Sequence, residues 1–298
     1  MDPSETGLLD MCSSMLPACS PSSADVRVKR AFHRMLPVAF AFAACGATAN
    51  ERCELSKVAN AGVLFQSGQH AFLLDAPFRD GVAPYETPEP EQRQRLETAQ
   101  PPYRGLSAIL ITHWHDDHFD AQAVTAHLRH DPAAMLVSSE EVVAQVRAAG
   151  AEDRQLLALT PPQGESVSTV IGGVRVHAIR LRHNPARRTP EQHLGFLVEG
   201  CQVIFHAGDA NPDASNFSAL RGLSPIDVAL LPYWYLDGAA NRDFVAEAIA
   251  PARIFAVHVP QAERAGVAQA LRSVPRAALL PASRAAVKLR PYSDGAPR

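Results

Sequence analysis

The chain lacks the features that mark several large classes of protein. Its 298 residues carry a net charge of −3, which argues against the basic face of a nucleic-acid-binding protein. No apolar run is long enough to span a bilayer, and no segment repeats along the chain. A hydrophobic content of 47% is sufficient for one large domain or two small ones. These observations favour a globular enzyme with a small-molecule substrate.

Cysteine is also scarce. Three of the five cysteines precede the expected folded domain, which leaves Cys53 and Cys201. An oxidising compartment would permit a disulfide between them, but two cysteines alone do not show that they are close in space. The sequence therefore favours separate buried thiols.

The first fifty residues differ from the rest of the chain. Basic residues at 27, 29, 30 and 34 precede an apolar stretch at 35–44, and Ala47, Thr48 and Ala49 then offer a cleavage site. This order is typical of a secretory signal, whereas a buried amphipathic helix would need a polar face. We expect an N-terminal extension and signal peptide over residues 1–49, a functional domain over 50–298, and export to the periplasm.

One alternative to soluble export is a lipid anchor. The four residues that end at Cys45 weakly resemble a bacterial lipobox, in which Cys45 would be acylated. Phenylalanine occupies the place where such boxes prefer leucine, so soluble export is favoured.

Metal-ligating residues are densest between residues 106 and 120. An apolar run at 106–112, typical of a buried strand, ends abruptly at His113. His113, His115, Asp117 and His118 follow, a spacing that suits a loop folding back over a strand end better than one helical face. Imidazole nitrogen and carboxylate oxygen bind zinc and similar dications. A solvated, histidine-rich turn is the alternative.

This segment resembles the His-x-His-x-Asp-His motif of the metallo-β-lactamase fold superfamily, whose members are mostly metal-dependent hydrolases. The resemblance covers residues 58–259. It implies an α/β fold, namely a four-layer αββα sandwich of the metallo-β-lactamase type, with metals at one edge of the two sheets.

Residue patterns predict elements that suit such a sandwich. Expected strands are 53–58, 62–66, 71–75, 106–112, 134–138, 166–171, 174–181, 194–199, 202–205, 226–232 and 253–257. Expected helices are 91–99, 120–129, 140–149, 242–249 and 262–273. Ser138 or Ser139 is expected to cap the helix at 140–149.

The proline-rich segment 77–104 is too long for a simple connection. Two interpretations stay open. It is either a lid beside the metals that carries Tyr85, or an excursion over the surface.

Further ligand candidates follow other expected strands. His183 ends the strand at 174–181, and His258 ends the strand at 253–257. Asp209 closes a strand-Gly-Asp element similar to the one whose aspartate bridges both metals in the superfamily. Asp75 and His206 are expected beside the ligands rather than among them.

The resemblance implies two metal ions, zinc in the first instance, with manganese or iron as alternatives. A water shared by two ions loses a proton near neutral pH, and Asp117 is the candidate catalytic residue that would help to protonate the leaving group. Seven residues would hold the metals: His113, His115 and His183 one ion, Asp117, His118 and His258 the other, and Asp209 both.

His193 competes with His183 for the third place at the first ion. His183 leaves room for a loop and a full hairpin before Asp209, as the superfamily usually shows, and is preferred. Arg187 and Arg188 would then lie in a loop over the metals.

Other residues receive structural interpretations. His127 and His130 are expected on a helix surface. Tyr233, Trp234 and Tyr235 form either a pocket wall or core packing, with a slight preference for the wall. The chain beyond residue 273 shows no visible chemistry.

The expected reaction is hydrolysis of a small neutral ester or lactone, because no cluster of Lys or Arg adjoins the motifs to grip a phosphodiester. Phosphodiester cleavage ranks behind it. β-Lactam cleavage is disfavoured, since secreted β-lactamases of this fold commonly carry cysteine or serine where this chain has Asp209. An iron-dependent thiol oxygenase and a metal-binding module without turnover remain alternatives from other classes. Beyond the substrate no partner is implied.

Overall fold

The structure is a computed structural model that describes residues 52–185, 192–282 and 285–289. The predicted signal peptide, the cleavage site after Ala49, the lipobox at Cys45, and Arg187 and Arg188 lie outside the described residues. In the part that is described, no helix combines the length and the apolar character needed to cross a membrane.

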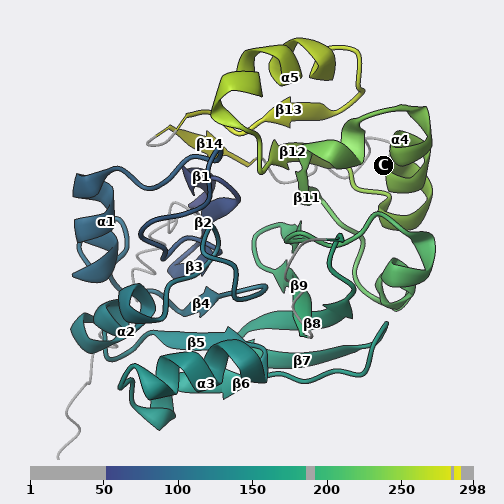
Figure 1. Ribbon diagram of the computed structural model, residues 1–298. Helices are drawn as coiled ribbons and strands as arrows, with labels where there is room; N and C mark the ends of the chain where they lie inside the picture. Colours follow the sequence, from purple (N-terminus) through teal and green to yellow (C-terminus); the bar gives the residue numbers. More distant parts are fainter. Residues whose placement is uncertain (1–51, 186–191, 283–284, 290–298) are drawn as a thin grey trace, which may run out of the picture. The chain divides into compact units, whose positions relative to one another are not determined.

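Two seven-stranded sheets form the centre of the described domain (Figure 1). The first sheet has the order β14-β1-β2-β3-β4-β5-β6, with β1 Cys53–Ala59, β2 Gly62–Ser67, β3 His70–Leu74, β4 Ala108–Leu110, β5 Met135–Ser138, β6 Leu156–Ala158 and β14 Ala286–Lys288. The second has the order β13-β12-β11-β10-β9-β8-β7, with β7 Ser166–Ile171, β8 Val174–Leu181, β9 His193–Glu199, β10 Val203–His206, β11 Val228–Pro232, β12 Arg253–Val257 and β13 Ala277–Leu279.

An apolar core lies between the two sheets. Alternate residues of β2 and β3, including Phe65 and Phe72, pack in one cluster with Phe196 of β9 and Leu230 of β11. All four side chains are fully buried. The parallel strands β4 and β11 are buried on both faces, which explains why they read as continuous apolar runs in the sequence.

Helices cover the outer face of each sheet (Figure 1). The first sheet packs against α1 Pro90–Glu97, α2 Ala121–His130 and α3 Glu140–Ala148, with the 3₁₀ turn η1 Asp153–Gln155 nearby. The second packs against α4 Ala239–Phe244, α5 Arg264–Leu271, the 3₁₀ helices η2 Ala214–Gly222 and η3 Tyr233–Leu236, and the π-helical turn η4 Val245–Ile249. The 3₁₀ turn η5 Gln261–Glu263 precedes α5 and has no buried residue. The layers are therefore helix, sheet, sheet, helix, and the predicted αββα sandwich is confirmed.

Several short elements differ from the prediction. The strand expected at 106–112 is regular only over Ala108–Leu110, and the helix expected at 242–249 is divided between α4 and η4. Strands β6, β13 and β14 were not predicted at all. Each has only three residues, which is too few to show a period of two in the sequence.

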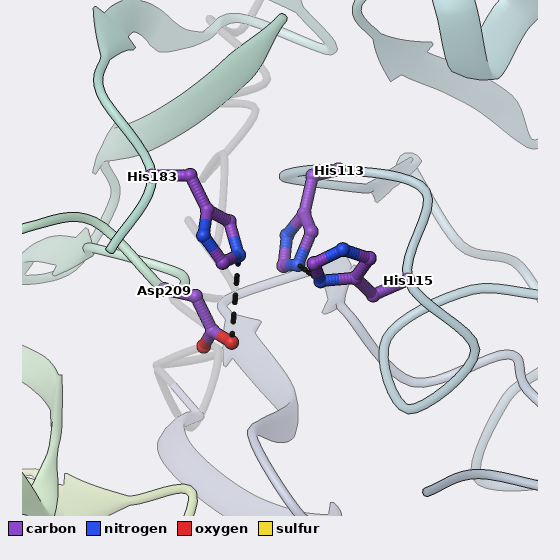
Figure 2. A group of neighbouring side chains, drawn as sticks. All are labelled: His113, His115, His183 and Asp209. Atoms are coloured by element: carbon purple, nitrogen blue, oxygen red, sulfur yellow. Dashed lines mark hydrogen bonds and ion pairs between the residues drawn. The ribbon is translucent and has the colours of Figure 1, made fainter. Parts of the chain in front are cut away.

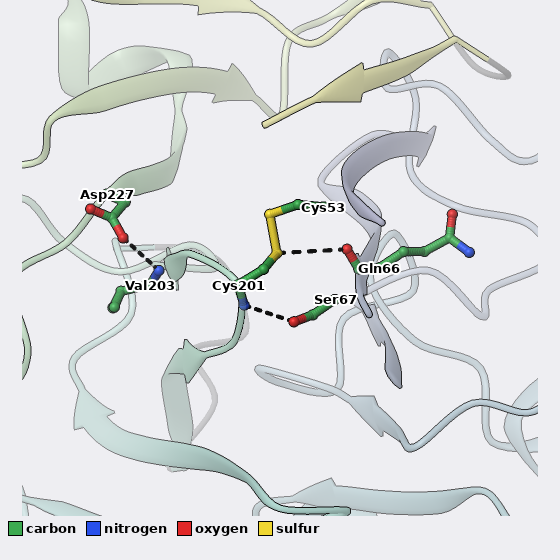
Figure 3. The surroundings of a disulfide bond; sticks show 6 residues. All are labelled: Cys53, Gln66, Ser67, Cys201, Val203 and Asp227. Atoms are coloured by element: carbon green, nitrogen blue, oxygen red, sulfur yellow. Dashed lines mark hydrogen bonds between the residues drawn. A yellow bond between two sulfur atoms is a disulfide. The ribbon is translucent and has the colours of Figure 1, made fainter. Parts of the chain in front are cut away.

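The prediction of separate thiols is wrong, because Cys53 and Cys201 form a disulfide, with Cα atoms 5.9 Å apart (Figure 3). Cys53 begins β1 in the first sheet, and Cys201 lies in the turn between β9 and β10 in the second. The bond thus ties the two sheets together across 148 residues of sequence. Packing of one sheet on the other creates this proximity, and no local pattern encodes it.

His127 also departs from expectation. Its side chain is fully buried, and Nδ1 lies 2.6 Å from the carbonyl oxygen of Leu96 at the end of α1. Burial lowers the pKa of His127 below its usual value. His130 is exposed, as predicted. The polar neighbours of His127 in the sequence indicated an exposed position, but α1 packs against this side chain.

The predicted N-cap of α3 is confirmed in its position but not in its side-chain hydrogen bond. Ser139 occupies the N-cap position but forms no capping hydrogen bond, and the Ser138 hydroxyl donates instead to the Ile111 carbonyl at 2.6 Å.

Candidate metal centre

The candidate ligands converge because the strands that precede them end at one edge of the sandwich. β3 runs parallel to β4 in the first sheet. In the second sheet β10 runs parallel to β11, and β11 runs parallel to β12. The carboxyl ends of parallel strands meet at the same edge. The loop after β4, His183 after β8, Asp209 after β10 and His258 after β12 are all carried there.

The first ligand group consists of His113, His115, His183 and Asp209 (Figure 2). One candidate ligand atom from each residue lies within 4.8 Å of the others. His113 Nε2 and His115 Nδ1 are 3.0 Å apart, and His183 Nε2 is 3.8 Å from Asp209 Oδ2. Three imidazoles and one carboxylate thus point at a common centre.

The second ligand group consists of Asp117, His118 and His258. His258 Nε2 lies 3.0 Å from Asp117 Oδ2 and 3.2 Å from Asp209 Oδ2. His118 Nε2 lies 3.3 Å from Asp209 Oδ1. The carboxylate of Asp209 therefore lies between the two groups and within reach of both.

Unpaired buried atoms show that these groups fit metal ions. Within the described residues, four polar atoms at the centre are buried and have no hydrogen-bond partner. Leaving such atoms unpaired is costly unless another ligand satisfies them. They are the Nε2 atoms of His118, His183 and His258, and Oδ1 of Asp209.

Three of the ligand histidines are oriented by a hydrogen bond in which Nδ1 is the donor. An oxygen that accepts from Nδ1 fixes the tautomer in which Nε2 keeps its lone pair for a metal. The pairs are His113 with Thr112 Oγ1 at 2.8 Å, His118 with Asp75 Oδ2 at 2.9 Å, and His183 with the carbonyl oxygen of Asn184.

Asp75 lies behind the ligands, as expected, and hydrogen bonds connect it to several residues there. Its carboxylate accepts from the backbone and the hydroxyl of Thr112, each at 2.7 Å, and from His206 Nε2 at 2.8 Å. Burial alone would raise the pKa of Asp75, but His118 and His206 hold it well below the usual range. An ionised Asp75 therefore anchors His118 from the side away from the metal centre.

The surroundings of His113 and Asp209 hold these two ligands in the protonation states that metals need. Burial first, and then the charge of His118, holds the pKa of His113 well below its usual value. Burial opposes ionisation of Asp209, yet His258 and His118 hold the pKa of this carboxyl well below its usual range. Neutral imidazole and ionised carboxylate are the ligand forms.

His193 supports Asp209 instead of joining a ligand group. Its Nε2 accepts a hydrogen bond from the backbone N–H of Asp209 at 3.0 Å, and the side chain is fully buried. Gly208 makes this contact possible. It has a φ of +53°, and a Cβ there would lie 2.7 Å from His193 Nε2 and from Thr112 Oγ1. The structure brings His183, and not His193, into the first ligand group.

A cavity of about 580 Å³ opens over both ligand groups. Its wall includes the aromatic residues Tyr85, Trp114 and Trp234 and the apolar residues Val82 and Pro185. Among the described residues, no lysine or arginine lines it. This volume suits a small ligand, and the aromatic wall suits an uncharged one.

The three consecutive aromatic residues after β11 have different surroundings, and only one of them lines this cavity. Trp234 lines it, as the pocket-wall interpretation requires. Tyr235 is instead fully buried in the core, where its hydroxyl donates to the Ala210 carbonyl at 2.6 Å. Tyr233 lines a separate cavity of about 490 Å³ beside α5. Because the segment forms the helical turn η3, its side chains diverge.

Comparison with known proteins agrees with this geometry. The family model described as "Beta-lactamase superfamily domain" matches residues 70–282. A UPF0173 metal-dependent hydrolase from Nanoarchaeum equitans is 28% identical over 166 residues, which cover 55% of this chain and 67% of that protein.

Two solved structures share the fold. An isothiocyanate hydrolase from Delia radicum gut bacteria has a TM-score of 0.56 at 16% identity, covering 79% of this chain and 99% of that one. The diiron β-hydroxylase CmlA from Streptomyces venezuelae has a TM-score of 0.54 at 14% identity, covering 80% of this chain and 54% of that one. At such identities the likeness shows the fold alone.

Proposed function

Since the chain belongs to the beta-lactamase superfamily and is a metal-dependent hydrolase, we propose that it uses two metal ions to hydrolyse a small uncharged ester or lactone. One observation carries this proposal. The two ligand groups lie side by side and share the carboxylate of Asp209, which reaches His118 and His258 at 3.3 and 3.2 Å.

The donor set determines which metals the site would take. Five imidazoles and two carboxylates suit zinc, with manganese or iron as alternatives. Two bound ions would lower the pKa of a shared water and polarise the electrophilic group of the substrate. We expect close to two ions per chain by elemental analysis of protein purified without chelator, and a folded protein without metal would contradict the proposal.

Asp117 is the residue we assign to proton transfer. Asn60 Nδ2 donates to its Oδ2 at 2.9 Å, which fixes the carboxylate. Burial opposes ionisation, but His118 and His258 hold the pKa of Asp117 below its usual value. The ionised carboxylate lines the cavity, where it would accept a proton from the attacking water and return it to the leaving oxygen.

The wall of the cavity supports an uncharged substrate. Asp116 is the exposed carboxylate at its rim, and it would repel an anion such as a phosphodiester. The carboxylate of Asp116 does not repel small neutral esters and lactones. The isothiocyanate hydrolase from Delia radicum gut bacteria has a 16% identical chain, so isothiocyanates enter only as further small neutral electrophiles to be tested.

A substrate panel tests the proposal. Protein reconstituted with zinc is assayed with 4-nitrophenyl acetate, γ-butyrolactone, bis(4-nitrophenyl) phosphate, allyl isothiocyanate and a chromogenic cephalosporin. We expect the ester or the lactone to give the highest kcat/KM, and chelator-treated protein to be inactive. Dominant cephalosporin or phosphodiester hydrolysis would overturn the substrate assignment, whereas iron content coupled to oxygen consumption with a thiol would overturn hydrolysis itself.

We also propose export. Support comes from the order of basic, apolar and small residues before position 50 and from the disulfide between Cys53 and Cys201, since disulfides persist in oxidising compartments. Intact-mass measurement on protein from the native host is expected to show cleavage after Ala49. A product that retains residues 35–44 would refute export, and a diacylated Cys45 would replace soluble export by a lipid anchor.

A further inference from the structure

The proline-rich segment between β3 and α1 brings Tyr85 to the metal centre. Tyr85 lines the cavity together with Asp117 and His258. Its ring meets the His258 ring edge to face, with centroids 4.1 Å apart and planes inclined at 73°. Of the two interpretations of this segment, the structure therefore favours the one that places Tyr85 beside the ligands.

The hydroxyl of Tyr85 has no partner among the described residues. The other buried tyrosines use their hydroxyls inside the protein, since Tyr103 accepts from Gln92 Nε2 at 2.9 Å and Tyr235 donates to Ala210 at 2.6 Å. No hydrogen bond joins the phenol of Tyr85 to any described group. A half-buried hydroxyl in a cavity wall is thus available to a bound ligand.

The hydroxyl is available as a donor. A phenolic hydroxyl has a pKa of about 10 in water, so it serves as a hydrogen-bond donor at neutral pH. The phenol keeps its proton at neutral pH, beside two carboxylates that make the site unsuitable for a phenolate. A preorganised donor of this kind is most effective where negative charge develops on a reacting oxygen.

Contacts to both sheets hold the residues on either side of Tyr85. Glu86 forms an ion pair with Lys57 on β1 of the first sheet, and Lys57 is only 4% exposed. The Pro84 carbonyl accepts from the backbone N–H of Gln261 at 3.2 Å, just after β12 of the second sheet. The turn that carries Tyr85 is therefore fixed over the centre from two directions.

From these contacts we propose that Tyr85 is a catalytic residue that donates a hydrogen bond to the substrate oxygen lying over the second ligand group, and that the pair of Lys57 and Glu86 positions it. The substrate class rests on the proposed function, but the donor role does not depend on which electrophile is cleaved. Removing the hydroxyl therefore weakens any ligand that places an oxygen there.

The test uses Tyr85→Phe in the full, zinc-loaded protein. Acetohydroxamic acid, which chelates metals through two oxygens, is titrated by calorimetry. A net hydrogen bond contributes about 0.5–1.5 kcal/mol, so the Kd of Tyr85→Phe is expected to rise about two- to twelvefold. Zinc content is expected to stay at the wild-type level. On the panel substrate that the wild type hydrolyses, kcat falls more than KM changes, because the bond strengthens as charge develops on the oxygen.

Tyr103→Phe is the matched control. It makes the same chemical change within the proline-rich segment 77–104, on the other side of α1. Its hydroxyl contacts Gln92 and does not line the cavity over the metal centre. We expect wild-type Kd and kcat from this variant. An equal loss in both tyrosine variants would assign the effect to the segment as a whole and overturn the donor role.

The positioning role is tested by replacing the ion pair with Lys57→Met and Glu86→Leu together, because a lone buried charge would destabilise the fold. This double variant is expected to weaken acetohydroxamic acid in the wild-type background and to add no further loss in Tyr85→Phe. Additive losses would show that the pair acts independently of Tyr85.

Two outcomes separate this inference from the proposed function. A wild type that turns over nothing in the panel defeats the proposed function, while the hydroxamate titration still decides the role of Tyr85. Wild-type Kd and wild-type kcat in Tyr85→Phe defeat the donor role, whichever substrate is cleaved.

Discussion

The two ends of the sandwich are built on opposite principles. At the metal end, buried nitrogens and a carboxylate oxygen are left without partners, and His258 adopts a φ of +56°, which is uncommon outside glycine. At the opposite end, β1 begins and β9 turns into β10. There, a disulfide joins the sheets, Ser67 Oγ accepts from the backbone N–H of Cys201 at 2.7 Å, and Asp227 accepts from Val203 at 2.9 Å (Figure 3).

This difference teaches how the molecule separates function from stability. The metal end carries unpaired polar atoms and strain, as functional sites often do. Satisfied hydrogen bonds and a covalent link hold the sheets together at the far end. Changes at one end are therefore expected to affect activity, and changes at the other to affect the free energy of unfolding.

The largest expected effect is that of Asp209→Ala. Asp209 serves both ligand groups, whereas His258 serves one, so Asp209→Ala should lose more metal and more activity than His258→Ala. Metal catalysis contributes several kcal/mol, which predicts a loss of about a thousandfold or more in kcat/KM. Elemental analysis and kinetics of the two variants measure this, and greater loss in His258→Ala would contradict a shared carboxylate.

Next comes the comparison of His183→Ala with His193→Ala. His183 lies in the first ligand group, and His193 only supports the backbone of Asp209. We expect His183→Ala to lose about one ion per chain. His193→Ala should keep both ions and lose activity by about 10–100-fold, as for other residues behind a ligand. If only His193→Ala loses an ion, the ligand assignment is wrong.

At the far end, the double change Cys53→Ser and Cys201→Ser tests the stabilising role. Opening a loop of 148 residues should lower the free energy of unfolding by about 2–5 kcal/mol. Denaturant titration measures this, with zinc content and kcat expected to remain close to wild type. A large fall in kcat in folded protein would show that the two ends are coupled.

The smallest effect is expected from Ser67→Ala, which removes the acceptor for the Cys201 N–H. One such bond contributes about 1 kcal/mol, so unfolding should shift slightly and kcat not at all. Ser107→Ala is a suitable control, because the hydroxyl that it removes is hydrogen-bonded only to the half-exposed side chain of His70 among the described residues. A shift in Ser67→Ala no larger than in Ser107→Ala would mean that the disulfide alone holds this corner.

The metal end was largely predictable, and the far end was not. His113, His183, Asp209 and His258 each follow a recognisable strand, so their convergence could be inferred from the rule that parallel strands end together. Nothing local links Cys53 to Cys201, whose proximity arises only when the two sheets pack. The position of Tyr85 over His258 escaped firm prediction for the same reason, since it depends on contacts to Lys57 and Gln261.

Strand pairing at the edge of the first sheet bears on how the chain is made. β1 pairs with β14, placing Leu55 opposite Val287, and in the second sheet β12 pairs with β13. During synthesis, β1 cannot pair with β14 until more than two hundred residues after β1 have left the ribosome. Contacts so distant in sequence slow folding. Until β14 pairs with it, the exposed edge of β1 can pair with another nascent chain. A chaperone that binds this edge is therefore expected to raise the yield of native protein.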